Sequence, residues 1–194
     1  QDTNFLSINR HTLREIIPFF RKHKTITCYI ETRPETINPT SISLLNDLNV
    51  DGVGMGVEVS ADLFREDHLN RHCTTSKIKR AFSLLREAGI KRTAYNIIGL
   101  PGQTEADIKS TIELNSDIDP DHVTVAYYSP YIGTEMSRKA ASEGMYDLMK
   151  DYVDGQLQTT VKDNYSDVST DLLNYYKSNF TQLVREHQKL NNVK

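Results

Sequence analysis

Residues 50–59 read VDGVGMGVEV, with a hydrophobic residue or glycine at all positions except Asp51 and Glu58. A strand that is wetted on one face alternates between apolar and polar residues, whereas a strand covered on both faces reads as a nearly continuous apolar run. Helical patterns flank this stretch, residues 38–48 before it and residues 74–88 after it, the second closed by Gly89. Residues 50–59 are therefore predicted to form a buried strand of a parallel sheet.

Three further runs have β character: residues 25–31 (TITCYIE), 92–99 (RTAYNIIG) and 122–129 (HVTVAYYS). Helical patterns separate them, at residues 12–23 before the first run and from a Thr104/Asp107 capping box before the last. Strands that alternate with helices predict an α/β fold made of parallel βα repeats. Beyond residue 144 no strand of comparable strength follows, and a helix is expected over residues 170–190. We divide the chain into βα units at 1–137 and a helical C-terminal extension at 138–194.

Composition excludes several classes of protein. Acidic residues exceed basic ones by 26 to 23, so no overall basic field exists to hold nucleic acid. Cys28 and Cys73 are too few for a disulfide scaffold, and we interpret the nearby His68 and His72 as surface residues and not as metal ligands. There is no apolar run long enough for a membrane span and no signal pattern, and free thiols suit a reducing compartment. A cytoplasmic protein is expected.

Each predicted strand after the first ends in a segment that can bind a ligand. Glu58 places a carboxylate at the end of residues 50–59, and residues 95–103 (YNIIGLPGQ) and 127–134 (YYSPYIGT) each lead from an apolar run into a polar turn. Parallel strands bring their carboxyl ends to one edge, where open sheets and barrels bind ligands. We expect one binding mouth there. A solvated Glu58 and turns without a ligand are the alternatives.

Two arginines are candidates for the same mouth. Arg33 follows residues 25–31, and Arg71 lies in the connection after residues 50–59. A guanidinium offers a rigid, bidentate donor to an anion, although an exposed loop arginine is the alternative for both. The glycines within residues 50–59 do not make a dinucleotide fingerprint, because Val57 and Val59 stand where its last glycine is required. Such glycines mark the close approach of a ligand or of another backbone.

Five segments in this order resemble the radical SAM superfamily, especially the branch often joined to cobalamin-binding domains. The resemblance covers about residues 1–137 and implies part of a TIM-like partial (βα)6 barrel, with the four predicted strands as its third to sixth. The segments are CYIETRPETI (28–37), DGVGMGVEVS (51–60), LNRHCTT (69–75), REAGIKRTAYNIIGLPGQT (86–104) and VAYYSPYIGTEM (125–136).

The resemblance implies two cofactors, S-adenosylmethionine (SAM) and a [4Fe-4S] cluster on a CxxxCxxC loop, with cobalamin in a separate domain. A reductant such as flavodoxin or ferredoxin would supply the electron that cleaves SAM, and the resulting 5′-deoxyadenosyl radical would take hydrogen from a small-molecule substrate. By position, the cofactor-binding residues would be Glu58 at the ribose or methionine part, Ile97, Ile98 and Gly99 beside adenine, and Tyr128, Ser129 and Pro130 near the adenosyl group. Arg33 and Arg71 would face SAM or the substrate.

This sequence departs from the family pattern at three places. Val59 stands where many members carry serine after the glutamate, and Gln103 stands where the family often has glutamate. No CxxxCxxC occurs, and the two cysteines present cannot replace three thiolates at one cluster. The first expectation is therefore a catalytic-domain fragment whose cluster ligands lie upstream of Gln1 and which is inactive alone.

Two alternatives stay open. The chain is either a degenerate barrel that serves as a non-catalytic nucleoside-binding or protein-interaction module, or a different barrel enzyme that uses Glu58 as an acid or base. The fold by itself does not identify the substrate or the type of reaction.

Overall fold

The computed structural model describes residues 4–8, 10–129, 133–142, 144 and 164–191. Within these residues, four strands form one parallel sheet in the order β1-β2-β3-β4, which is also their order along the chain. The α/β fold with parallel βα repeats is therefore confirmed. The strands are Cys28–Thr32 (β1), Val50–Glu58 (β2), Lys91–Ile98 (β3) and His122–Tyr127 (β4).

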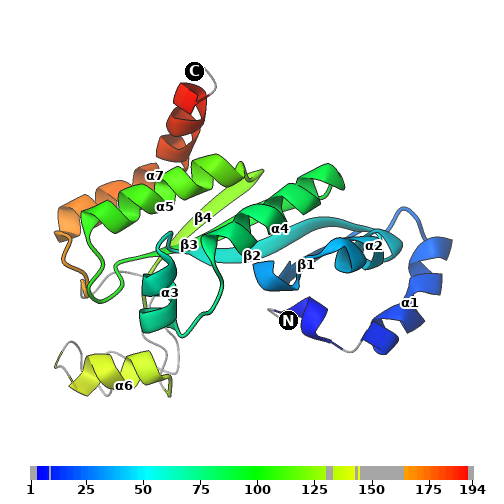
Figure 1. Ribbon diagram of the computed structural model, residues 1–194, viewed down its shortest axis with the longest axis horizontal. Helices are drawn as coiled ribbons and strands as arrows, with labels where there is room; N and C mark the ends of the chain where they lie inside the picture. Colours follow the sequence, from blue (N-terminus) through cyan, green and yellow to red (C-terminus); the bar gives the residue numbers. More distant parts are fainter. Residues whose placement is uncertain (1–3, 9, 130–132, 143, 145–163, 192–194) are drawn as a thin grey trace.

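Helices α2, α4 and α5 lie side by side across one face of this sheet (Figure 1). Helix α7 continues the layer beside α5, and α1 packs against α2 at the other end. The helices are α1 (Arg10–Lys22), α2 (Pro39–Asp47), α3 (Asp62–Leu69), α4 (Thr75–Glu87), α5 (Glu105–Ile118), α6 (Glu135–Ser142) and α7 (Thr170–Asn191), with 3-10 turns η1 (Phe5–Ser7) and η2 (Pro34–Thr36).

Side-chain caps fix the starts of three helices as the sequence predicts. Asn38 accepts hydrogen bonds from the backbone of Thr40 and Ser41 at the start of α2. Thr104 and Asp107 form a reciprocal capping box at the start of α5, and Thr74 caps α4. Each cap satisfies N–H groups that have no partner within the helix, so these boundaries are set locally.

Two elements differ from the expectation. The first strand begins at Cys28, not at residue 25, because the amide of Asn49 donates to the carbonyl oxygens of Lys24 and Ile26 and holds that segment as a turn. The polar connection after residues 50–59 contains an additional helix, α3, which the sequence reading missed.

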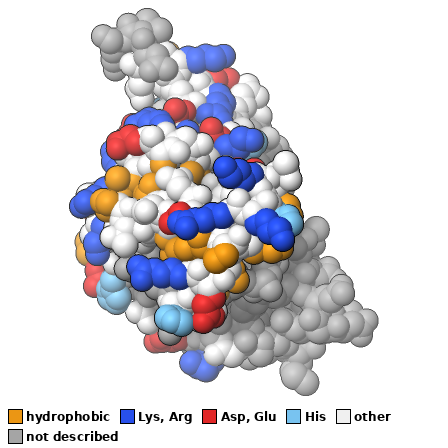
Figure 2. All heavy atoms as spheres, turned by 90° about the vertical axis from the view of Figure 1, so that its right-hand side faces the viewer, with side chains coloured by type: hydrophobic (Ala, Val, Ile, Leu, Met, Phe, Trp, Pro, Cys, Tyr) orange, Lys and Arg blue, Asp and Glu red, His pale blue; other side chains and the backbone are white. Residues whose placement is uncertain are grey.

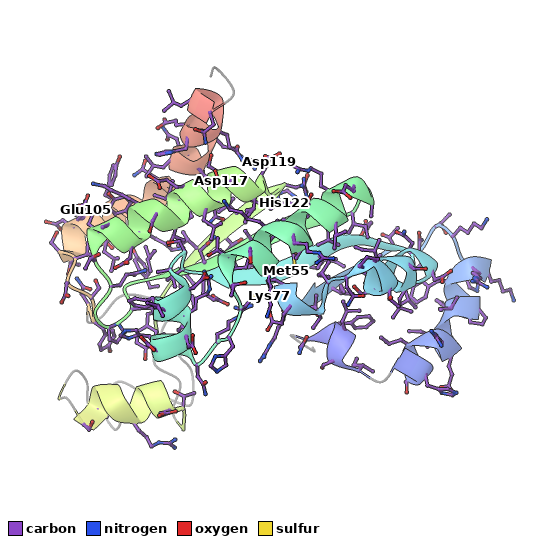
Figure 3. All side chains as sticks on the ribbon, in the orientation of Figure 1. Met55, Lys77, Glu105, Asp117, Asp119 and His122 are labelled. Carbon is purple, nitrogen blue, oxygen red and sulfur yellow. The ribbon has the colours of Figure 1, made fainter. Side chains whose placement is uncertain are left out.

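The sheet and its helices enclose two hydrophobic clusters. The first lies under α2 and α4, where Met55 of β2, labelled in Figure 3, packs with Ile78 and Phe82. The second lies between β3, β4, α5 and α7 and includes Ile98 and Phe180. Val53, Met55 and Val57 of β2 and Ile98 of β3 point to the helix-covered face, and the opposite face carries the β2 glycines together with Tyr95 and Ile97 of β3.

Helix α7 covers the outer edge of β4. Thr181 Oγ1 donates to the carbonyl oxygen of Val123 at 3.5 Å, and Lys177 Nζ donates to that of Val125. Next to Lys177, the Tyr176 hydroxyl donates at 2.7 Å to Glu105, which lies at the start of α5 (Figure 3). A covered edge cannot pair with another strand.

None of the described helices, including this long one, has the length and apolar character needed to cross a membrane.

Helix α1 buries only part of its apolar surface. Leu13 and Ile17 are buried, whereas Ile16 and Phe19 are 41% and 50% exposed, and Ile26 just after the helix is 43% exposed. Figure 2, which faces this end of the molecule, shows apolar side chains among Lys and Arg. The helix predicted for residues 12–23 is thus confirmed, and about half of its apolar face lies outside the core.

We expect Phe180→Ala to lower the free energy of unfolding by about 3–4 kcal/mol, because the ring is 1% exposed in the second cluster. Urea unfolding followed by circular dichroism measures this change. Tyr175→Ala, at a half-exposed position on the same helix, is the control and should cost under about 1 kcal/mol. Equal costs for the two variants would mean that α7 is an appendage and not part of the core.

Candidate functional site

A cleft of about 320 Å³ opens at the carboxyl ends of β1, β2 and β3. Parallel α/β sheets bind ligands at this edge, so the cleft lies where the sequence places the binding mouth. Its walls come from four segments: Glu31, Thr32 and Arg33 from the end of β1, Gly54, Gly56 and Glu58 from β2, Leu69, Asn70 and Arg71 after α3, and Tyr95 from β3.

Glycines form the floor of the cleft. Residues at alternate positions of β2 face the same side, and on the side away from the helices these are Gly52, Gly54 and Gly56. A Cβ atom on Gly54 would lie 2.6 Å from the hydroxyl oxygens of Tyr29 and Tyr95. The absence of side chains on this strand therefore lets residues of β1 and β3 extend across it.

Glu58 ends β2 in an uncommon backbone conformation. Its φ of 64° is in the left-handed region, which glutamate rarely adopts, and the pairing of β2 with β3 shifts register between Gly56 and Glu58. Its side chain is 19% exposed. Burial raises the pKa of the Glu58 carboxyl, and the Arg71 guanidinium opposes that rise. Strain of this kind at a cleft indicates a functional position.

Arg71 is the counter-ion of Glu58. Its Nη1 donates to Glu58 Oε1 at 2.8 Å, and its Nη2 lies 3.9 Å from Glu35 Oε2. The buried Nε has no hydrogen-bond partner among the described residues. A Cβ atom on Gly56 would overlap the Glu58 carboxylate and come within 2.7 Å of Arg71 Nη1. A side chain at this position would therefore displace the ion pair from its present place.

Arg65, on α3, holds the connection that carries Arg71. Its side chain is fully buried, and it donates to the carbonyl oxygens of Val59, Ser60 and Cys73, to Asp62 and to Thr75. These bonds join the end of β2 to the start of α4. The backbone N–H of Arg71 in turn donates to the carbonyl oxygen of Arg65 at 2.9 Å. One buried side chain thus fixes the segments on both sides of the cleft's ion pair.

Gln103 shapes the turn after β3. Its Oε1 accepts from the backbone N–H of Gly99 at 2.7 Å and of Leu100 at 3.4 Å, and Gly99 has a φ of 82°. The side chain is fully buried. This turn needs an acceptor oxygen. Gln103, which stands where the family often has glutamate, supplies that oxygen without a charge.

The structure brings three of the residues predicted from sequence into the cleft: Glu58, Arg33 and Arg71. Ile97, Ile98 and Gly99 lie at the end of β3, but the Ile98 side chain packs into the second hydrophobic cluster, so only its backbone faces the site edge. Its carbonyl oxygen accepts from the N–H of Tyr128 at 2.7 Å. Ser129 follows, half-buried, and Pro130 lies outside the described residues. The five described residues of this group, from Ile97 to Gly99 and Tyr128 with Ser129, do not line the cleft.

Sequence reasoning missed Glu31, Tyr95 and Tyr29. Glu31 and Tyr95 line the cleft, and the Tyr29 hydroxyl lies 3.0 Å from that of Tyr95. The available signal was alternation, because Tyr29, Glu31 and Arg33 occupy every second position of one predicted strand and its end. Which face they shared followed only from the strand register.

A model of the radical SAM superfamily matches residues 6–114, which is more than half of the chain. The chain belongs to the radical SAM superfamily. The resemblance seen in the strand-end motifs is confirmed.

Two curated relatives of this radical SAM chain illustrate the spread of the superfamily. Anaerobic magnesium-protoporphyrin IX monomethyl ester cyclase from Rubrivivax gelatinosus is 34% identical over 79 residues, 41% of this chain and 14% of the cyclase. tRNA-2-methylthio-N(6)-dimethylallyladenosine synthase from Moorella thermoacetica is 28% identical over 111 residues, 55% of this chain and 25% of that protein. The chain thus spans a quarter or less of the length of these relatives.

Solved structures show the same fold. The radical S-adenosylmethionine methyltransferase TsrM from Kitasatospora setae, with cobalamin and a [4Fe-4S] cluster bound, aligns with a TM-score of 0.66 at 19% identity over 74% of this chain and 30% of its own. Coproporphyrinogen III oxidase (HemN) from Escherichia coli, a radical SAM enzyme, aligns with a TM-score of 0.65 at 19% identity over 91% of this chain and 38% of its own. The partial-barrel fold is therefore confirmed.

The described residues of this radical SAM chain do not fit an iron–sulfur cluster. Cys28 is half-buried at the amino end of β1, and Cys73 is buried after α3. Burial, together with Glu35, raises the pKa of Cys73 to about 11, which disfavours the thiolate that binds iron. No group of three potential metal ligands occurs in the part of the chain that the structure describes.

We expect Arg65→Met to lower the free energy of unfolding by about 3 kcal/mol, because it leaves buried carbonyl oxygens without a donor. Urea unfolding measures the loss. Arg86→Met, at an exposed position of α4, is the matched control and should change stability by less than about 0.5 kcal/mol. A variant as stable as this control would exclude Arg65 as the residue that holds the connection.

Proposed function

We propose that this chain is part of a radical SAM enzyme and that its cleft binds SAM. The observation that carries the proposal is Glu58, a carboxylate held in a strained backbone conformation at the carboxyl end of a glycine-lined strand and paired with Arg71. The carboxylate accepts hydrogen bonds from ribose hydroxyls or from an ammonium, and the Arg71 guanidinium, which lines the cleft, donates to a carboxylate. SAM carries all of these groups.

The remaining predicted residues have defined roles in this proposal. The backbone of Ile97, Ile98 and Gly99, and the side chain of Ile97, would flank adenine. Tyr128, Ser129 and Pro130 would lie near the adenosyl group, and Arg33, which is exposed beside the cleft, would face SAM or the substrate. The hydrogen bond from Tyr128 to Ile98 joins these two segments, so they would act as one wall.

The chemistry requires groups that the described residues do not provide. SAM bound next to a reduced [4Fe-4S] cluster supplies a 5′-deoxyadenosyl radical that abstracts hydrogen from a substrate. We propose that cysteines other than Cys28 and Cys73 ligate the cluster, that a flavodoxin or ferredoxin reduces it, and that the substrate is a small molecule. The part of this chain is to bind and orient the cofactor and to exclude water.

Two further features of the proposal concern the whole protein. The methyltransferase TsrM binds cobalamin, and we propose a cobalamin-binding domain for this protein as well. We also propose that residues 1–137 are the barrel units and 138–194 an extension, whose helix α7 completes the second hydrophobic cluster. The cytoplasmic location stays a prediction. Membership of the superfamily does not favour the degenerate, non-catalytic module.

We expect the 194-residue chain to bind SAM in isothermal titration calorimetry and Glu58→Gln to weaken that binding about 10-fold, because a charged acceptor is lost. Glu113→Gln, on the exposed side of α5, is the control and should leave the affinity unchanged. Because the pKa of Glu58 is raised, affinity should fall on acidification at a higher pH than for an exposed glutamate, and Glu58→Gln should remove this dependence. Equal affinity of wild type and Glu58→Gln would contradict the assignment of the cleft.

We expect this chain, incubated anaerobically with iron and sulfide, to hold no [4Fe-4S] cluster, because its only cysteines are Cys28 and Cys73. Absorption in the blue-violet and chemical iron analysis measure cluster content. Cluster assembly that survives in Cys28→Ser and Cys73→Ser would show that ligands other than these cysteines exist within the chain.

A further inference from the structure

A second group of polar side chains lies level with Gly54, four residues before Glu58 on β2, and two of its members, Glu31 and Tyr95, line the same cleft. Tyr29 and Glu31 extend from β1 and Tyr95 from β3, and they meet above Gly54 of β2. The Tyr95 hydroxyl donates to Glu31 Oε1 at 3.1 Å, and the hydroxyls of Tyr29 and Tyr95 are 3.0 Å apart. We refer to Tyr29, Glu31 and Tyr95 as the acceptor cluster, for a reason that follows from its protons.

The direction of each hydrogen bond in this cluster is fixed. A phenol has one hydrogen to donate, and that of Tyr95 is used on Glu31. In the bond between the two tyrosines, the donor must therefore be Tyr29. Both hydroxyl hydrogens are then engaged, and what remains exposed to a ligand is lone pairs, on Tyr29 Oη and on the Glu31 carboxylate. The cluster can only accept hydrogen bonds.

The charge of Glu31 is not neutralised by a basic side chain of the described residues. Its one hydrogen bond there comes from Tyr95, and it takes part in no described ion pair. The two arginines of the cleft are directed at other carboxylates, Arg71 at Glu58 and Glu35, and Arg33 at Glu35. A half-buried carboxylate next to a phenolic acceptor attracts an N–H donor or a cation.

Tyr29 adds an aromatic surface. The residue is 52% exposed, although its ring lies against the glycine strand, where a Cβ atom on Gly52 would be 2.7 Å from Tyr29 Cδ2. Hydrogen bonding through Tyr95 fixes the ring at its hydroxyl. A fixed, exposed phenol ring is a surface on which another flat ring packs with little loss of side-chain entropy.

We propose that the acceptor cluster binds a flat, unsaturated ring bearing an N–H group, with the ring against Tyr29 and the N–H directed at Glu31. That this ring belongs to the substrate rests on the proposed function. The binding site itself does not, because Glu31 and Tyr29 lie on β1, level with Gly54 and Gly52, whereas Glu58 is four residues further along β2 than Gly54. The two parts of the cleft can therefore be tested by different variants.

Indole is the probe, and 1-methylindole, which lacks the N–H, is its matched control. The chain contains no tryptophan, so indole fluorescence excited beyond the absorption of tyrosine reports only the probe. A fixed, low concentration of indole is titrated with the 194-residue chain. We expect the emission to shift to shorter wavelength, and 1-methylindole to bind about tenfold more weakly, because it cannot donate to Glu31.

Two variants assign the contacts. Tyr29→Leu should weaken indole binding about fivefold, and Glu31→Gln should weaken indole while leaving 1-methylindole unchanged. Tyr175→Leu, at an exposed tyrosine of α7 outside the cleft, is the control, and circular dichroism checks that each variant is folded. No emission shift with the wild type, equal binding of indole and 1-methylindole, or indole binding by Tyr29→Leu at wild-type strength would each overturn the proposal.

The comparison with SAM binding separates this proposal from the proposed function. Indole binding that depends on Glu31, in a chain that does not bind SAM, supports the acceptor cluster and contradicts the proposed function. SAM binding that depends on Glu58, in a chain that does not bind indole, supports the proposed function and contradicts the acceptor cluster.

Discussion

On the face of β2 away from the helices, a Cβ atom at Gly52, Gly54 or Gly56 would overlap side chains of the candidate site where they now lie, and the arrangement of the site depends on this steric constraint. Because Gly52 and Gly54 carry no side chains, Tyr29 from one neighbouring strand and Tyr95 from the other reach across the sheet and meet. Because Gly56 carries none, the Glu58–Arg71 ion pair lies over the strand's end. Side chains from three segments distant in sequence thus share one cleft. A single alanine in this row would separate groups that lie on different strands.

The opposite face of the sheet is held by hydrogen bonds as well as by apolar packing. Asn96 of β3 and Asn115 of α5 donate to each other's side-chain oxygens at 3.1 and 2.7 Å, and both also donate to backbone carbonyls. One turn away, Thr111 accepts from the N–H of Ser60 just after β2. Fully satisfied buried networks of this kind specify one arrangement, since any slip leaves polar groups unpaired. They fix how α5 sits on β3, and hence where the turn that follows β3 lies.

Much of the fold could be predicted from sequence because its signals are local. Asn38, Thr74 and Thr104 mark helix starts by capping chemistry, and the apolar run of β2 predicts a strand buried on both faces, most of whose residues are buried in the structure. The partners of Glu58 could not be predicted in the same way. Arg71 was one of two candidate arginines, and its choice depends on α3, whose buried Arg65 gave no apolar signal. The place of Glu31 in the cleft depends on the register between strands. So does the choice of Ile97 over Ile98 as the side chain that faces away from the helices. No single stretch of sequence contains this register.

The described sheet has unlike edges. On the β4 side, α7 places a hydroxyl and an ammonium on the outward carbonyl oxygens, so that edge is closed to pairing. On the β1 side, no strand in the described part of the chain pairs with the outer edge. An additional strand that paired with the described sheet would therefore join beside β1. It would lie next to Tyr29 and Glu31, which makes the wall of the acceptor cluster the first part of the site that such a strand would meet.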